Sequence, residues 1–319
     1  MKGKKISLIK EATFGVDNPT PKPYPICASS LGLVSTDEME ENKCIGAGDT
    51  GGNKTKVGDK QSGDLVMNAT YENAYFALYM QYGEPTLVDN GDGTFTRTFS
   101  SATECIPSYS VQSILDDAGS CETTTTEWVE RFNGCKANTL SLTADKSQPK
   151  FTIGLIGAKF GASYLTPAIT KVDETNEVVL AKTPILAKTA AISFNSAPYC
   201  RLSKFEVKSD NGIKETDVIC DVGTSLQKEG YDTTVSIEGI FNKDLVPKIA
   251  NNETVAMGLK YTDGTNSLEF VFDEMQGEFK SQPITGMEKL KLSETLTAVR
   301  VAGAERVKVV LTNSVASYA

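Results

Sequence analysis

The chain has 319 residues, enough for about two domains of ordinary size. Hydrophobic residues make up 39% and charged residues 23%, which is typical of a folded globular protein. The 32 basic and 41 acidic side chains give a formal net charge of −9, which argues against tight non-specific binding of nucleic acid, because such binding needs a basic surface. There is no histidine, which excludes Ser-His-Asp and Cys-His catalysis, a histidine general base and histidine-ligated zinc.

The first half of the chain predicts a strand, a short helix and then a hairpin. A strand is expected over Leu65–Tyr71 and runs directly into a helix over Glu72–Tyr82, whose apolar residues recur at helical spacing. The turn residues Asp92-Gly93 precede the next strand, Thr94–Phe99. Two later strands complete this half, at Thr139–Ala144 and Phe151–Phe160.

The second half predicts the same order of elements. A second short helix is expected over Asn242–Ala250, where Pro247 is tolerated only in the first turn. The turn residues Asp263-Gly264 indicate another hairpin. The strands expected here are Ala190–Phe194, Leu202–Lys208, Thr234–Ile240, Ser267–Phe272, Leu296–Val301 and Val307–Thr312. The chain is therefore expected to be mainly β.

Because strand, helix, Asp-Gly-Thr hairpin and a final pair of strands occur in this order twice, we interpret the chain as a weak internal duplication. The first β domain is expected to span residues 1–185 and the second residues 186–319. Glu41–Asp64 is rich in Gly, Lys and Asp and has almost no apolar content, so we expect it to be a long polar loop, which is either disordered or an interaction arm.

Several short motifs match enzyme signatures but lack the context that those signatures require. Gly46–Gly51 matches G-x-G-x-x-G, yet no strand is expected before it and no helix after it, so a nucleotide site is not supported. Ser7/Lys10 and Ser225/Lys228 match Ser-x-x-Lys, and Ser209–Asn211 reads Ser-Asp-Asn, but the Lys-Thr-Gly element of that enzyme class is absent.

The acidic clusters read as solvated surface or turns. Asp116/Asp117 and Asp273/Glu274 are neighbouring acids of the kind that arise freely among 41 acidic residues, and Asp89–Gly93 lacks a calcium ligand that an EF-hand loop needs. The seven cysteines form no C-x-x-C pair, so no zinc ribbon is expected. No catalytic, cofactor-binding or metal-binding residue is therefore predicted, and the chain is expected not to be an enzyme.

The best remaining signal is the arrangement of strands, helix and turns across Leu202–Phe272, with LSKFEVKSDN, GTSLQKEGYDTTVSIEGIF and YTDGTNSLEFVF. The segments EATFGVDNPTP and SGDLVMNATYENAYFALYMQYGE add to it. In these features the chain resembles the tail tube (major tail) proteins of long-tailed bacteriophages.

The resemblance implies a packed antiparallel β-sandwich or barrel with a short helix on its flank, here present twice. It implies a structural virion protein, assembled in the host cytoplasm, whose stacked rings form a hollow tail tube with an acidic lumen through which DNA passes without lasting binding. Partners would be further copies of the chain and other tail proteins, such as the tape measure, terminator and distal tail proteins, with no membrane insertion. Two tube domains per chain predict a homotrimeric, pseudo-sixfold ring, with a homohexamer as the competing stoichiometry.

Two other functions stay open at this point. The tube of a contractile injection or secretion system is physically the same device without a genome to deliver. A carbohydrate-binding surface β protein is disfavoured because such proteins expose clustered aromatic residues, and this chain has a single Trp.

Overall fold

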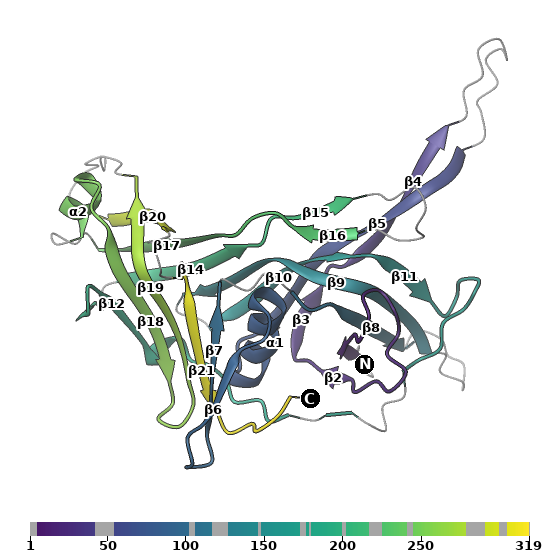
Figure 1. The fold of residues 1–319 in the computed structure, drawn as a ribbon, viewed down its shortest axis with the longest axis horizontal. Helices are drawn as coiled ribbons and strands as arrows, with labels where there is room; N and C mark the ends of the chain where they lie inside the picture. The colour runs from purple at the N-terminus through teal and green to yellow at the C-terminus, as the bar shows by residue number, and fades with distance from the viewer. Residues whose placement is uncertain are drawn as a thin grey trace, which may run out of the picture.

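Antiparallel strands make up most of the computed structural model, with two α-helices in its described part (Figure 1). The structure describes residues 5–41, 54–101, 106–116, 127–145, 148–172, 177–178, 180–199, 202–216, 225–240, 245–278, 291–299 and 305–318. The mainly β fold expected from the sequence is confirmed.

A broad antiparallel sheet, called here the central sheet, contains strands from both halves of the chain. Its neighbouring strands are, in order, β3 (Ala28–Leu31) with β4 (Val34–Glu41), β5 (Lys54–Asn68), β10 (Lys150–Gly157), β9 (Glu127–Ala144), β14 (Leu202–Asp210), β17 (Asp232–Ile240) and β20 (Lys291–Ala298). Beyond β14 and β17 a two-stranded ribbon continues the same hairpin, formed by β15 (Ile213–Thr216) and β16 (Ser225–Lys228).

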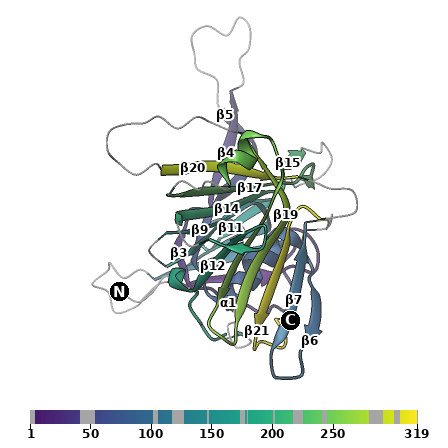
Figure 2. The same cartoon turned by 90° about the vertical axis from the view of Figure 1, so that its left-hand side faces the viewer.

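A second sheet stands against the central one and is joined to it where β19 pairs with β20. Its order is β13 (Ala197–Pro198), β12 (Ala190–Phe194), β18 (Val255–Thr262), β19 (Ser267–Gly277), β21 (Lys308–Asn313), β7 (Phe95–Ser100) and β6 (Thr86–Asp89). In Figure 2 these strands run vertically, with β12 and β6 at opposite sides.

A smaller group of strands extends the first half of β9. It comprises β2 (Tyr24–Pro25), β1 (Lys5–Lys10), β8 (Tyr109–Asp116) and β11 (Lys159–Ala162). The remaining helical elements of the described chain are η2 (Ala187–Thr189) and α2 (Val246–Ala250), in which Pro247 occupies the first turn as its missing N–H requires.

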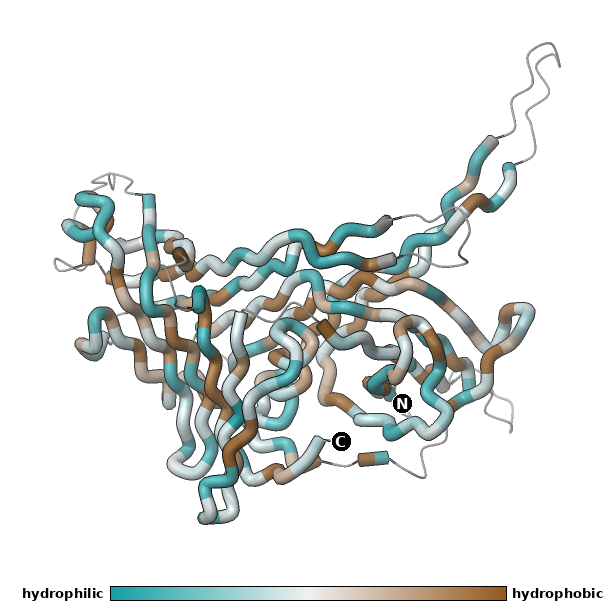
Figure 3. Tube along the Cα trace, in the orientation of Figure 1, coloured by the Kyte–Doolittle hydropathy of each residue, from teal (hydrophilic) through white to brown (hydrophobic). Residues whose placement is uncertain are grey.

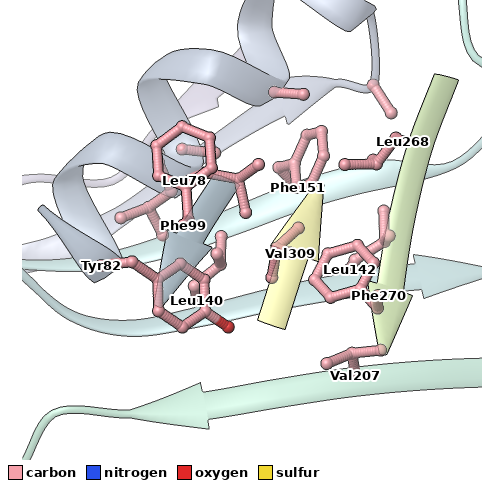
Figure 4. Packing of buried hydrophobic residues seen from close by; sticks show 14 of the residues in the cluster. Leu78, Tyr82, Phe99, Leu140, Leu142, Phe151, Val207, Leu268, Phe270 and Val309 are labelled. Atoms are coloured by element: carbon pink, nitrogen blue, oxygen red, sulfur yellow. The ribbon is translucent and has the colours of Figure 1, made fainter. Parts of the chain in front are cut away.

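The helix α1 (Tyr71–Tyr82) lies between the layers and has no broad solvent-facing side. Eleven of its twelve residues are buried, and only Tyr75 is partly exposed. The Thr70 side chain accepts a hydrogen bond from the Asn73 N–H at its start, and Gly83, with φ of 82°, ends it. Figure 4 shows Leu78 and Tyr82 of this helix in the same cluster as side chains from both sheets.

Apolar residues at alternate strand positions supply the core, as the period of a strand requires. Across the central sheet, one buried row runs in register through Met67, Phe151, Leu142, Val207, Val235 and Leu296. Figure 3 shows hydrophobic residues concentrated within the layers. Burial of this row against α1 and the second sheet orients the opposite face of the central sheet away from the core.

Most strands predicted from the sequence are confirmed, within a few residues at their ends. β7, β12, β14, β17, β19 and β21 match their predicted ranges closely. The prediction for Phe151–Phe160 was wrong in one respect, because two strands, β10 and β11, are separated at Ala158. Tyr71 was predicted in a strand but begins α1, since Thr70 caps the helix there.

The expectation of a polar loop over Glu41–Asp64 was wrong for its second part. β5 begins at Lys54 and pairs with β4 as far as Glu41, forming a hairpin that projects from the body (Figure 1). Both faces of this hairpin meet solvent near its tip, so the strand needs no apolar face and leaves no period-two hydrophobic signal. Residues 42–53 lie outside the described part.

The two expected halves share their order of elements but not a separate sheet. β5 precedes α1 and the β6–β7 hairpin, and β17 precedes α2 and the β18–β19 hairpin. Strand pairing crosses the 185/186 boundary twice, between β9 and β14 and between β7 and β21. Division into two duplicated domains therefore stays a proposal about ancestry and assembly.

Candidate functional surfaces

The face of the central sheet that points away from the core is polar and regular. In-register pairing across six strands produces two rows on this face: Asn68, Lys150, Thr143, Glu206, Ser236 and Thr295, and next to it Val66, Thr152, Ser141, Lys208, Thr234 and Thr297. Seven of these twelve side chains carry a hydroxyl group. We call this surface the hydroxyl face.

Charges of both signs are spread over the hydroxyl face. Lys204 lies 3.8 Å from Glu206 and 3.5 Å from Glu238, measured between the amine nitrogen and a carboxylate oxygen. The two rows hold Glu206 against Lys150 and Lys208, and the adjoining positions of the same face on β5, β14 and β17 add Asp64, Asp210, Asp232 and Glu238 against Lys204. Such a surface offers many weak hydrogen-bonding groups and no concentrated positive charge.

The projecting β4–β5 hairpin, called here the arm, is held together by cross-strand ion pairs. Across the two strands, the Lys56 amine lies 2.6 Å from Asp37 and the Lys60 amine lies 2.6 Å from Glu38, while within β5 Lys56 is also 3.0 Å from Asp59. Hydrogen bonds to Asp37 and Asp59 raise the pKa of Lys56. These pairs are exposed, so each contributes little to stability, but together they favour one register of the two strands.

The arm also exposes apolar side chains, namely Val34, Met39 and Val57, the last with 60% of its surface accessible. Solvent-exposed apolar residues on a hairpin that stands clear of the body indicate a contact surface for another protein molecule.

A second exposed apolar group lies where β9 begins. The ring of Trp128, the single tryptophan of the chain, is 5.4 Å from that of Tyr164, and both are about half exposed. The Tyr164 hydroxyl donates a hydrogen bond to Glu130, and Leu165 next to it is exposed.

The motifs that matched enzyme signatures are not assembled into sites. Ser7 and Ser209 are buried, and the Ser209 hydroxyl bonds those of Tyr82 and Thr233. Asp273 and Glu274 lie at a β-bulge of β19 between the buried Phe272 and Met275, with Asp273 exposed and Glu274 partly exposed. Gly46–Gly51 and Asp117 lie outside the described residues.

Nor do the described residues form a metal centre, since no group of three or more Cys, Asp or Glu side chains among them is placed to hold an ion. Cys27 and Cys135 are free thiols, and burial raises the pKa of Cys135 well above its usual range, which suppresses its reactivity. In the part of the chain that the structure describes, no helix is long and apolar enough to cross a membrane.

Sequence reasoning identified no site residues, and the surfaces found here show why. The alternation in Lys204–Lys208 was visible in the sequence, but its outward set becomes a surface only when strands distant in sequence align beside it. The composition of Glu41–Asp64 marked the arm as a polar excursion, but its strands gave no period-two signal because neither face of the hairpin is apolar.

Comparison with known proteins gives one result. A family model for the phage tail tube protein matches residues 2–299. A search of curated proteins finds no match to the chain.

Proposed function

This chain belongs to the phage tail tube protein family, and from that premise we propose that it assembles into rings which stack as a hollow tube and conduct the phage genome into the host. A structural role in the virion tail follows from the family. The assembly into rings, the channel and the passage of DNA through it are our proposals.

The observation that carries the proposal is the hydroxyl face. Six adjacent strands present polar side chains in register on one side while burying the other side against the core. A sheet of this kind makes a smooth wall when it curves around a water-filled channel. We infer that the hydroxyl face lines the lumen.

The charges of this face suit DNA that must slide. Carboxylates repel phosphates, and Lys204 is paired with Glu206 and Glu238. Tight retention of DNA needs several uncompensated cations in contact with phosphates. The net charge of −9 adds long-range repulsion, which supports an acidic lumen.

Ring closure follows from the two ends of the central sheet. β3 forms one edge, and the first residues of β20, Lys291–Thr295, form the other, each with a strand partner on a single side within the described chain. Exposed edges of this length tend to pair with another chain. We propose that these edges meet between neighbouring copies and make the lumen wall continuous.

Stacking of rings is assigned to the arm. It stands clear of the body, exposes Val34, Met39 and Val57, and is stiffened by its own ion pairs. An arm of this kind reaches a neighbouring ring without disturbing the sheet that lines the lumen. Other tail proteins would then bind at the two ends of the finished tube.

The test is cryo-electron microscopy of the purified protein at rising concentration. We expect rings with a central hole that stack into tubes, and density in which the rows of Thr152, Ser236 and Thr295 face the hole. A chain that stays monomeric over the whole concentration range contradicts the assembly. Tubes whose lumen is lined by the second sheet contradict the assignment of the hydroxyl face.

A further inference from the structure

The second sheet ends on one side in an edge with exposed apolar residues and acidic charge. This acidic edge is Glu84–Asp92 and contains β6, which pairs only with β7 among the described strands. All four residues of β6 are exposed, and Leu87 and Val88, on opposite faces, each leave 52% of their surface accessible. Glu84, Asp89 and Asp92 are its charged residues, and no basic residue occurs in this range.

The opposite end of the same sheet has the opposite charge. This basic edge is Lys182–Ala191 and contains η2 and the start of β12. Lys182 and Lys188 are exposed, no acidic residue occurs in the range, and Leu186 leaves 40% of its surface accessible. β13 covers β12 only at Ser193 and Phe194, so the backbone of Ala190 and Ala191 has no strand neighbour on that side within the described chain.

The charge of each edge is complementary to that of the other edge and not to that of the same edge in a second copy. Each has exposed leucine or valine flanked by charges of one sign, so an acidic edge repels a second acidic edge and attracts a basic one. They lie at opposite sides of the sheet, as β6 and β12 do in Figure 2. Contact between unlike edges is head-to-tail, and repeated head-to-tail contacts close into rings.

We propose that the acidic edge of one copy docks against the basic edge of a second copy, so that the second sheet, like the central one, continues from copy to copy around the ring. This inference rests on the proposed function and names a contact surface and partner for it. It makes ring formation dependent on salt, since exposed charges are screened at high ionic strength.

Charge reversal at one edge tests the contact. In Lys182→Glu/Lys188→Glu the basic edge becomes acidic, and in Asp89→Lys/Asp92→Lys the acidic edge becomes basic, because only Glu84 then keeps its negative charge. Each double variant faces like charge across the contact, so we expect the concentration needed for ring formation to rise about tenfold or more, with partial recovery at high salt. Lys159→Glu/Lys308→Glu is the matched control, because these exposed lysines lie on β11 and in the middle of the second sheet.

A chain that carries all four edge substitutions again has one acidic and one basic edge, so its copies attract one another. Against the wild type, each of its edges meets an edge of like charge. We expect the combined variant to form rings with itself and to be excluded from rings of isotope-labelled wild type, as measured by native mass spectrometry of the mixture. Circular dichroism and thermal unfolding of each monomer check that the fold is kept.

The outcomes separate this inference from the proposed function. If the wild type forms rings and both double variants do so at the same concentration as the control, or if mixed rings of wild type and combined variant form freely, the edge contact is overturned and the function stands. If neither the wild type nor the control forms rings, the proposed function fails and this inference fails with it.

Discussion

Three buried charged side chains connect segments that lie far apart in sequence. Glu11 accepts hydrogen bonds from the Ser108 and Ser110 hydroxyls and from the Gly15 and Gly134 N–H groups. Arg131 binds Asp17, Gln112 and the Thr170 carbonyl. In each case a charge is tolerated inside the protein because its hydrogen-bonding capacity is filled. Such residues look like surface charges in the sequence.

Arg97 is the third buried charged side chain, and it binds the C-terminal end of the described chain. It donates to the Asn313 side chain at 3.0 Å and to the carbonyls of Val315 and Ala316 at 2.5 and 3.1 Å, and its guanidinium lies 4.8 Å from the ring centroid of Tyr318. The Tyr318 ring in turn stacks on Tyr75 of α1 at 3.8 Å. One side chain therefore joins β7, the segment after β21 and the central helix.

Replacing Arg97 by alanine should lower the free energy of unfolding by about 2–4 kcal/mol, because buried acceptors lose charge-assisted hydrogen bonds and stay buried. Denaturant unfolding of the monomer measures this. Lys308→Ala, an exposed change on the neighbouring β21, is the control and should stay within about 0.5 kcal/mol of the wild type. A loss below about 1 kcal/mol in Arg97→Ala would show that the segment is held by its apolar contacts alone.

At the scale of elements, α1 and the arm differ in how well local sequence signals specify them. The helix begins and ends at local residues, Thr70 and Gly83; Gly83 predicted its end, whereas Thr70 was predicted to lie in the preceding strand. The arm has strand geometry without a strand's hydrophobic pattern, and cross-strand pairs such as Lys60 with Glu38 specify its register instead. Because the arm projects from the body, we propose that it makes the contacts between rings.

Shortening the arm should stop stacking without harming the body. Thr36 and Lys60 lie opposite each other, so residues 37–59 can be replaced by Asn-Gly, a two-residue turn that suits a hairpin. We expect isolated rings in electron micrographs and no tubes. The thermal unfolding of the monomer should match that of the full-length chain, because the described side chains among those removed, at 37–40 and 54–59, are largely exposed. Tubes of normal length from this variant would move the stacking contact elsewhere, with the Trp128–Tyr164 pair as the next surface to examine.

At the scale of the whole molecule, the two halves form one body. The central sheet has strands of the second half, β14, β17 and β20, directly beside β9 of the first. Each half contributes a long hairpin, β4–β5 and β14–β17, and in each the returning strand pairs with one later strand, β5 with β10 and β17 with β20. This recurrence supports the duplication and with it a ring in which each copy fills two of six positions.

We therefore expect rings of three chains. Native mass spectrometry of isolated rings should find three times the chain mass of 34.3 kDa, and end-on averages of electron micrographs should show sixfold features with threefold symmetry. Six chains per ring would contradict the two-domain interpretation, while leaving the tube itself in place.

Local chemistry in the sequence determined a good part of this protein. Alternating apolar residues predicted strands such as β14 and β21, helical spacing predicted α1, Asp-Gly turns predicted the hairpins, and the lack of histidine excluded catalysis that depends on histidine. These signals depend on residues that are close in the sequence, so they can be recognised without knowledge of the fold. Tertiary structure alone decided that α1 is enclosed between sheets, that β9 meets β14 and β7 meets β21, and that separate polar strands form one hydroxyl face. Those outcomes depend on which strands pair although they lie far apart in the sequence. The period-two pattern of a strand specifies which of its faces is buried but not which strand lies beside it.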